Sequence, residues 1–274
     1  MLLIGLTGSI ATGKSTVSAL LHQPPHSLPI IDADLLARKV VAPGTPAYAR
    51  IIAHFAPSTP DLLLPASASL PAHGIDGKGR PLNRAALGRR VFGEGEERRR
   101  ERAVLNGIVH PAVRWAMARE VLGYWARGWW AVVLDIPLLF ESGLDVWCGV
   151  VIVVAVRDPE VQMRRLRERD RGLSGEEARG RVESQWDVRD KARRAGERGR
   201  GRGVVVWNDG GREELEREVK GVMEGVRTGS PWWWGWLLWV VPVLGVAVGV
   251  WGLVWNWWAR RRWEEGKKRE KAKL

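Results

Sequence analysis

The chain has 274 residues, which is room for one large domain or two modest ones. Its formal net charge is +12, and the C-terminal segment Arg260–Leu274 holds eight Lys or Arg against three Glu. This basic excess fits polyanionic ligands such as nucleotides; nucleic acid is disfavoured because the basic residues are not interleaved with stacking aromatics. The single cysteine, Cys148, excludes an internal disulfide and a cysteine-based metal cluster.

Strand-like and helix-like segments alternate from the N-terminus to about Val226. The predicted strands are Leu2–Leu6, Pro29–Ile31, Ala131–Leu134, Val150–Val156 and Val204–Trp207. Each is short and nearly continuously apolar, as in a parallel sheet that is covered on both faces. The predicted helices are Lys14–His22, Pro46–Phe55, Arg84–Val91, Glu96–Leu122, Pro159–Asp170 and Gly175–Arg198. The alternation predicts a doubly wound α/β domain over residues 1–226.

Three stretches interrupt this pattern. Residues 56–81 are rich in Pro, Ser, Ala and Gly, and we expect an exposed excursion there rather than a packed element. Residues 189–203 are basic and glycine-rich, and their second half is expected to be a mobile connection. Residues 227–231 predict a short linker after the domain.

The segment Trp232–Trp258 contains 27 residues without a charge. About 20 apolar residues span a bilayer, and tryptophans crowd both ends, as they do at membrane interfaces. The segment therefore predicts a transmembrane helix, followed by a basic tail over residues 259–274. A buried core helix is the weaker alternative, because soluble helices seldom run so long without a polar face. The arrangement resembles a tail anchor, with the N-terminal domain facing the cytosol at the mitochondrial outer membrane or the endoplasmic reticulum.

The first strand runs into GSIATGKS, residues 8–15, which fits the pattern Gly-x-x-x-x-Gly-Lys-Ser/Thr. Gly8 and Gly13 let backbone N–H groups turn inward around a polyphosphate, and the start of the next helix favours an anion. Lys14 is predicted to reach the β- and γ-phosphates, and Ser15 to coordinate Mg²⁺. The residues predicted to bind ATP are Gly8, Ser9, Ile10, Ala11, Thr12, Gly13, Lys14, Ser15 and Thr16.

Acidic residues follow two of the predicted strands. Asp32 and Asp34 lie after the second strand, at the edge where α/β proteins bind ligands. A carboxylate there can take the proton of an acceptor hydroxyl, while Asp32 is also a candidate N-cap of the next helix. Asp135 ends the third strand, where a Walker-B-type acid holds Mg²⁺ through water, and Glu141 follows in a predicted loop.

Five arginines lie within the short segment from Arg164 to Arg171. Arg165 and Arg169 are spaced i, i+4 and therefore share one face of a helix. Arginines on a closing flap can neutralise charge on a transferred phosphoryl group. The alternative is a solvated helix whose arginines pair with nearby Glu.

Seven motifs follow one another in order: LTGSIATGKSTVS, IDADLLAR, PGTPAY, LNRAALGRRVF, LNGIVHPAVR, LDIPLLFESGLD and RLRERDRGLS. This order resembles the dephospho-coenzyme A kinase family from Leu3 to about Val219. The resemblance implies a P-loop kinase fold with a five-stranded parallel sheet, a helical acceptor-binding subdomain and a lid. It also implies Mg²⁺-dependent transfer of the ATP γ-phosphate to the ribose 3′-hydroxyl of dephospho-CoA, the last step of coenzyme A synthesis.

The resemblance also implies roles for single residues. Asp34 would be the general base, Thr7 would help to orient the acceptor, and Arg169 would be the lid arginine. Asn208 would lie near the adenine of ATP. The residues implied at the acceptor are Asp32, Arg38, His110 and Glu141.

Two residues of the phosphate loop depart from the family, because many members have glycine where this chain has Ser9 and Ala11. Ser9 must then adopt a negative φ, or part of the backbone cradle is lost. Two alternative functions stay open. One is a P-loop kinase that acts on a different acceptor, and the other is a non-enzymatic adaptor that binds nucleotide only for regulation.

Overall fold

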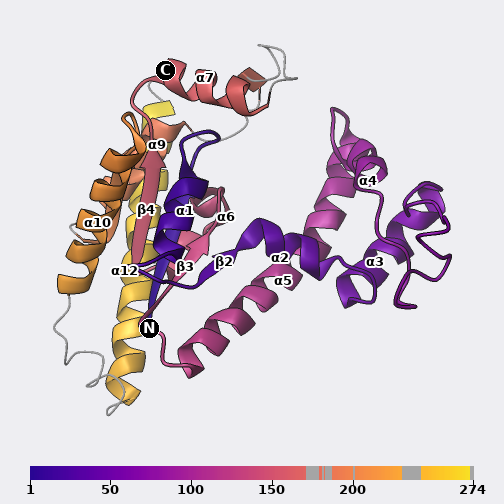
Figure 1. The fold of residues 1–274 in the computed structure, drawn as a ribbon, viewed down its shortest axis with the longest axis horizontal. Coiled ribbons are helices and arrows are strands. Elements are labelled where there is room, and N and C mark those ends of the chain that lie inside the picture. The colour runs from indigo at the N-terminus through magenta and orange to yellow at the C-terminus, as the bar shows by residue number, and fades with distance from the viewer. Residues whose placement is uncertain (171–178, 181, 183–186, 200, 230–241, 272–274) are drawn as a thin grey trace. The chain divides into compact units, whose positions relative to one another are not determined.

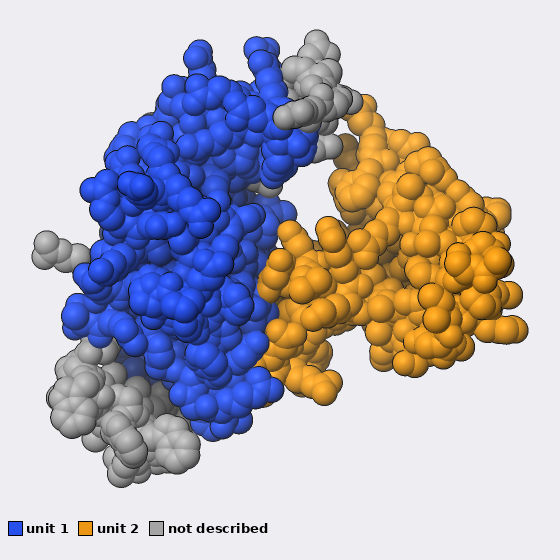
Figure 2. Space-filling model, in the orientation of Figure 1, with its two compact units in different colours: residues 1–31, 124–274 blue, residues 32–123 orange. Residues whose placement is uncertain are grey.

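A computed structural model of the chain describes residues 1–170, 179–180, 182, 187–199, 201–229 and 242–271 (Figure 1). The chain forms two compact units (Figure 2). The first unit combines Met1–Ile31 with Tyr124–Leu274, and the second is Asp32–Gly123. The phosphate loop belongs to the first unit, and each unit has its own apolar core.

Five strands form one sheet in the order β2-β3-β1-β4-β5. The strands are β1 (Leu2–Gly8), β2 (Ile30–Asp32), β3 (Ala131–Asp135), β4 (Val150–Ala155) and β5 (Gly203–Trp207). β1 pairs in parallel with both β3 and β4, and every residue of β3 and β4 is buried. The α/β class and all five predicted strands are confirmed, because continuous apolar runs are typical of strands covered on both faces.

The register of the sheet brings two predicted functional segments together. Leu6 of β1 lies opposite Asp135 of β3, and Gly8 lies opposite Val154 of β4. Neighbouring parallel strands end at the same edge of a sheet, where α/β proteins bind their ligands. The loop that follows β1 and the acid that ends β3 are therefore neighbours.

Helices α1 (Lys14–His22) and α10 (Arg212–Thr228) pack against one another in the first unit. Their side chains in the core of the sheet are Val17, Leu21, Leu215, Val219 and Met223. Helix α7 (Pro159–Arg169) follows β4, and α9 (Val188–Glu197) packs on β4 and β5. The helix predicted over residues 175–198 lies in part outside the described residues, and α9 is its described part.

The second unit is helical. It contains α2 (Ala33–Val40), α3 (Pro46–Phe55), the short 3₁₀ turn η1 (Ala56–Ser58), α4 (Arg84–Val91) and most of α5 (Glu96–Ala126). Side chains cap the first three helices: Asp32 caps α2, Thr45 caps α3 and Asn83 caps α4. Such caps satisfy N–H groups that a helix leaves without partners, and they fix where these helices begin.

The prediction that residues 56–81 form only an exposed excursion is wrong at two points. Leu62 is 1% exposed and belongs to the core of the second unit, together with Phe55 and Tyr48. The Tyr48 hydroxyl donates a hydrogen bond to the backbone carbonyl of Arg80 at 2.6 Å. The Pro and Gly content predicted the irregular backbone correctly, but one apolar side chain and one tyrosine anchor it.

The predicted transmembrane helix over residues 232–258 is not found among the described residues. Residues 232–241 lie outside them, and the rest belongs to a longer helix, α12 (Pro242–Lys271). None of the helices that the structure describes has an apolar stretch long enough to cross a bilayer. In the described part, residues 242–258 continue into the charged C-terminal residues as one helix, and they include a buried polar side chain, Asn256.

Helix α12 packs on the first unit through polar contacts. Asn256 Nδ2 donates to the carbonyl oxygens of Val146 and Cys148, at 2.8 and 3.2 Å. Both acceptors lie in or next to the 3₁₀ turn η2 (Leu144–Trp147). Lys267 pairs with Asp190 of α9 at 2.6 Å. α12 therefore contacts two separate elements of the first unit.

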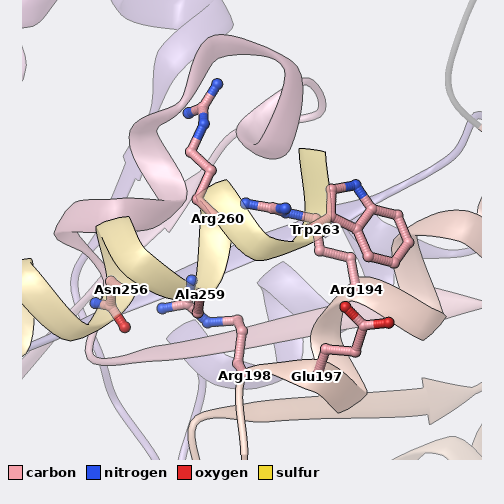
Figure 3. A pocket seen from close by; sticks show the side chains of 7 residues that line it. All are labelled: Arg194, Glu197, Arg198, Asn256, Ala259, Arg260 and Trp263. Carbon is pink, nitrogen blue, oxygen red and sulfur yellow. The ribbon is translucent and has the colours of Figure 1, made fainter. Parts of the chain in front are cut away.

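A buried carboxylate, Asp145 of η2, is the centre of this contact. It is 0% exposed and accepts hydrogen bonds from Arg194 at 3.0 Å and from Arg198 at 3.2 Å, with Arg260 of α12 at 3.7 Å. Trp263 is buried beneath the Arg194 guanidinium. Figure 3 shows a small cavity between α9 and α12, whose lining includes Arg194, Arg198, Arg260 and Trp263.

The other face of α12 is apolar and exposed. Its exposed large side chains are Val248, Val250, Trp251, Val254, Trp255, Trp257 and Trp258. Hydropathy along the sequence sums both faces of a helix, so it could not show that the polar face contacts protein. The membrane prediction rested on the high apolar content of residues 232–258, which does not distinguish one face of a helix from the other.

Candidate active site

The loop between β1 and α1 requires glycine at two positions. A Cβ atom on Gly8 would lie 2.7 Å from the carbonyl oxygen of Val154, and one on Gly13 would lie 2.1 Å from Nδ2 of Asn208. Gly13 also has a φ of 93°, in the left-handed region that favours glycine. Both glycines of the sequence pattern are therefore required by close approach, and Gly13 by its backbone conformation as well.

Side chains hold the loop in shape. Thr12 Oγ1 donates to the carbonyl of Ser9 at 2.9 Å. Asn208 Nδ2 donates to the carbonyl of Thr12 at 2.9 Å, and Gln162 Nε2 donates to the carbonyl of Ile10 at 2.7 Å. Asn208, which the sequence placed near adenine, is buried and supports the loop; its contact with adenine stays a prediction.

The two departures from glycine in this loop differ in conformation. Among the described residues other than glycine, only Ala11 and Ser27 have a positive φ, so Ser9 has the ordinary sign that its side chain requires. Ala11 has a φ of 60°. A left-handed conformation costs a residue with a Cβ about 1 kcal/mol or more, and the strain of the loop therefore lies at Ala11.

Helix α1 begins at Lys14, directly after a glycine that has no side chain to cap it. Thr16 and Val17 donate their N–H groups to the carbonyl of Gly13. The first N–H groups of a helix have no partner within the helix, and with the helix dipole they favour an anion. The start of α1, at Lys14 and Ser15, thus has the backbone arrangement of a phosphate site.

Lys14 Nζ forms a close ion pair with Asp135 Oδ1 at the edge of the sheet. The side chains are 18% and 7% exposed, so the pair is mostly shielded from water. The structure thus brings together the predicted phosphate-binding lysine and the predicted Walker-B-type acid.

Ser15 and Asp135 provide a hydroxyl and a carboxylate oxygen that could coordinate a magnesium ion at this edge of the sheet. Mg²⁺ is usually held by one or two carboxylates together with substrate phosphates and water, rather than by a protein cage. In the described part of the chain, no three His, Cys, Asp or Glu side chains gather into a metal-binding group. A hydroxyl and a carboxylate beside a phosphate loop fit a magnesium ion that arrives with a nucleotide.

A second group of polar contacts lies after β3, where α6 (Leu139–Ser142) begins. Thr7 is fully buried, and its Oγ1 donates to the carbonyl of Pro137 at 2.9 Å. The same carbonyl accepts a hydrogen bond from Lys191 Nζ at 3.0 Å, and this ammonium lies 3.1 Å from Glu141 Oε1. Thr7 and Glu141, both predicted to act at the acceptor, are therefore linked through a lysine.

Four predicted residues lie at or beyond the end of β2 and belong to the second unit. Asp32 Oδ1 accepts hydrogen bonds from the N–H groups of Asp34 and Leu35, so the N-cap interpretation of Asp32 is confirmed. Asp34 and Arg38 lie on α2, and His110 lies on α5; all three are exposed. Their roles at the acceptor stay predictions.

The two arginines that the sequence placed on one helix face have different environments. Arg165 donates to the backbone carbonyl of Asn208 at 2.8 Å, so it supports the residue that holds the phosphate loop. Arg169 ends α7, is 55% exposed, and pairs with its neighbour Asp170 at 3.2 Å. Its role as a lid arginine stays a prediction.

Sequence reasoning missed Gln162 and Lys191. The role of Gln162 could have been predicted, because Gln162 lies on the same predicted helix as Arg165. That helix directly follows β4, whose end lies beside the phosphate loop. Lys191 gave no signal, since it lies in a basic stretch whose lysines and arginines are expected in solvent. Its burial depends on partners in distant elements.

Known proteins resemble this chain over most of its length. The sequence model of the family described as "CoaE: Dephospho-CoA kinase" matches residues 2–211. A dephospho-CoA kinase of Geobacillus kaustophilus is 44% identical over 223 residues, covering 81% of this chain and 96% of the relative. The dephospho-CoA kinase CAB5 of Saccharomyces cerevisiae is 39% identical over 227 residues, covering 83% of each chain.

Solved structures show the same fold. The crystal structure of TT1252 from Thermus thermophilus matches with a TM-score of 0.58 at 31% identity, covering 81% of this chain and 96% of that one. A dephospho-CoA kinase from Campylobacter jejuni matches with a TM-score of 0.57 at 25% identity, covering 83% and 98%. With a family match over most of its length and relatives about 40% identical, the chain belongs to the dephospho-CoA kinase family.

Proposed function

We propose that the chain transfers the γ-phosphoryl group of ATP to the ribose 3′-hydroxyl of dephospho-CoA, which gives ADP and coenzyme A. The observation that carries the proposal is the phosphate loop whose Lys14 pairs with Asp135, in a chain of the dephospho-CoA kinase family. The names of the relatives support dephospho-CoA as the acceptor.

The phosphate loop positions the nucleotide. Phosphoryl transfer needs little covalent help from a protein, and its catalysis is mostly alignment and charge stabilisation. The amides at the start of α1 and the ammonium of Lys14 hold the phosphates. When bound beside Ser15 and Asp135, Mg²⁺ would neutralise charge on the phosphate oxygens.

Asp34 is the proposed general base. Its carboxylate takes the proton of the 3′-hydroxyl as that oxygen forms a bond to the γ-phosphorus, while the bond to the β–γ bridging oxygen breaks and ADP leaves. Asp32 is committed to capping α2, which leaves Asp34 for the proton. Arg38 and His110 would contact the acceptor, and Arg169 would stabilise the charge on the transferred group.

The deciding experiment incubates the purified full chain with ATP, Mg²⁺ and dephospho-CoA, and measures ADP by a coupled assay and coenzyme A by mass spectrometry. We expect stoichiometric ADP and coenzyme A, and no product once EDTA removes the metal. A Lys14→Met variant provides the background rate.

Two results would contradict the proposal. ADP that forms only with another hydroxyl acceptor would indicate a kinase of different specificity. ATP binding without transfer to any acceptor would indicate a regulatory adaptor.

A further inference from the structure

Lys191, near the start of α9, is a buried lysine to which the proposed mechanism assigns no role. Its side chain is 0% exposed, and a buried ammonium is costly unless it is paired and hydrogen-bonded. Burial lowers the pKa of Lys191, and the nearby Glu141 carboxylate opposes that shift. The position of its ammonium is therefore set by specific partners.

The partners of Lys191 lie in the segment that links β3 to α6. Its Nζ donates to the Pro137 carbonyl at 3.0 Å and lies 3.1 Å from Glu141 Oε1. The Pro137 carbonyl also accepts the Thr7 hydroxyl at 2.9 Å. One ammonium thus connects α9 to this turn and, through a shared carbonyl, to the end of β1, one residue before the phosphate loop.

Glu141 is the carboxylate that this ammonium holds. Both of its carboxylate oxygens are buried: Oε1 lies 3.1 Å from Lys191 Nζ, and Oε2 has no hydrogen-bond partner among the described residues. Buried polar atoms are nearly always hydrogen-bonded, so a carboxylate in this state is suited to accept donors from a ligand. The Pro137 carbonyl accepts from both Lys191 and Thr7, and Thr7 directly precedes the phosphate loop, so the Lys191–Glu141 pair lies near that loop.

We propose that Lys191 is a positioning residue for phosphoryl transfer, which fixes the Glu141 carboxylate and the Pro137 turn against Thr7 at the acceptor side of the phosphate loop. Lys191 does not touch substrate; it acts through Glu141 and Thr7. The inference rests on the proposed kinase function and adds to it Lys191, a residue of α9. Stability alone is the competing explanation, and α9 provides a control for it.

The control is Arg198, which directly follows α9. Like Lys191 it is a buried cation paired with a carboxylate, but its partners are Asp145 at 3.2 Å and the carbonyl of Cys148 at 2.7 Å, away from the phosphate loop. Lys191→Met and Arg198→Met should both lower Tm. Only Lys191→Met should lower kcat with dephospho-CoA, by about 10- to 100-fold, the scale of misplacing a reacting group. Arg198→Met should keep kcat within about twofold of the unmodified chain, well below its Tm.

A double variant separates positioning from stability. Lys191→Met alone leaves the Glu141 charge buried without its cation, and Glu141→Gln removes that charge. Lys191→Met combined with Glu141→Gln should therefore recover Tm while kcat stays low. If Lys191→Met alone does not fold, the kcat and Tm of this double variant still test the proposal.

The proposal is overturned if Lys191→Met keeps the kcat of Arg198→Met, or if the double variant regains kcat together with Tm. Failure of the proposed function would look different. The unmodified chain itself would then form no coenzyme A, whereas an active chain with an equally active Lys191→Met variant would refute only the role of Lys191.

Discussion

Asp32 and Asp34, the two carboxylates at and just after the end of β2, differ in their hydrogen bonds. Both were candidates from their position alone, because an acid at a strand end can serve as a cap or as a base. In the structure Asp32 accepts two backbone N–H groups, and Asp34 donates one of them. The cap is therefore assigned to Asp32, and the role of Asp34 at the acceptor hydroxyl stays a proposal.

Asp34→Ala should lower kcat for dephospho-CoA by about 10²-fold, the usual effect of removing a general base. Asp32→Ala is the matched change, and it should instead cost about 1 kcal/mol of stability through the lost cap. Steady-state kinetics and urea unfolding of both variants measure the two effects. An Asp34→Ala enzyme with unchanged kcat would remove Asp34 from the mechanism.

Cys148 makes stability depend on alkaline pH. Burial raises the pKa of its thiol from the ordinary value of 9.0 to about 12. The folded state thus favours the protonated thiol, and this contribution is complete below pH 9 and is lost as pH rises from 9 towards 12. The unfolding free energy should fall by about 1.4 kcal/mol per pH unit in that window.

A Cys148→Ala variant tests this dependence. It should be less stable at pH 7, because it leaves a small cavity, but the difference from the unmodified chain should shrink between pH 9 and pH 10.5. Other groups titrate alike in both proteins and cancel in the comparison. Urea unfolding at pH 7, 9 and 10.5 measures the difference, and a constant gap would refute the assignment to the thiol.

At the level of elements, α9, η2 and α12 meet at one buried charge. Asp145 is the shared partner of Arg194 and Arg198, with Arg260 near its other oxygen. Burial lowers the pKa of Arg198, and Asp145 opposes that shift. Removing one member of a buried ion cluster leaves uncompensated charge, which costs more than the intact cluster contributes.

Asp145→Asn should therefore lower the unfolding free energy by about 3 kcal/mol. Glu264→Gln is the control, since Glu264 also pairs with Arg260, at 2.8 Å, but is half-exposed. An exposed pair contributes less than about 1 kcal/mol, so this variant should unfold nearly like the unmodified chain. Equal losses from both variants would show that the Asp145 cluster does not hold the elements together.

The elements that the sequence predicted well carry their signals locally. The helices Lys14–His22, Pro46–Phe55 and Arg84–Val91 were predicted to the residue, because each begins at a glycine turn, a proline or a capping asparagine. Lys14 and Asp135 were predicted separately as phosphate-binding and magnesium-binding residues, and the ion pair between them was not predicted. Lys191 could not be predicted, because its burial is created by a turn 54 residues away.

At the level of the whole molecule, the first unit extends beyond the part of the chain that matches the family model. The family model ends at residue 211, but α12 lies beyond it and contacts η2 and α9 within the matched region. The hydropathy of the C-terminal segment indicated a separate membrane element. Within the described residues, Asn256 instead joins α12 to η2 of the first unit, and a membrane span over residues 232–258 stays a prediction.

A chain that ends after Gly229 should therefore unfold at a lower temperature than the full chain. It would lose the hydrogen bonds of Asn256 to Val146 and Cys148 and would expose the Asp145 cluster to water. Differential scanning calorimetry of the two proteins measures the change, and Val254→Ala, on the exposed face of α12, is the matched change that should leave Tm nearly unaltered. Equal Tm values for the truncated and full chains would show that α12 adds nothing to this unit.

The contact between Asn256 and η2 also sets an order of events during synthesis. The chain leaves the ribosome from its N-terminus, and Asn256 joins carbonyls that were made about 110 residues earlier. The sheet and phosphate loop can be complete while the Val146 carbonyl still lacks its partner in α12. Synthesis that stops before α12 would then release a protein with the whole nucleotide site but with an open flank at η2, a species that quality-control proteins can recognise.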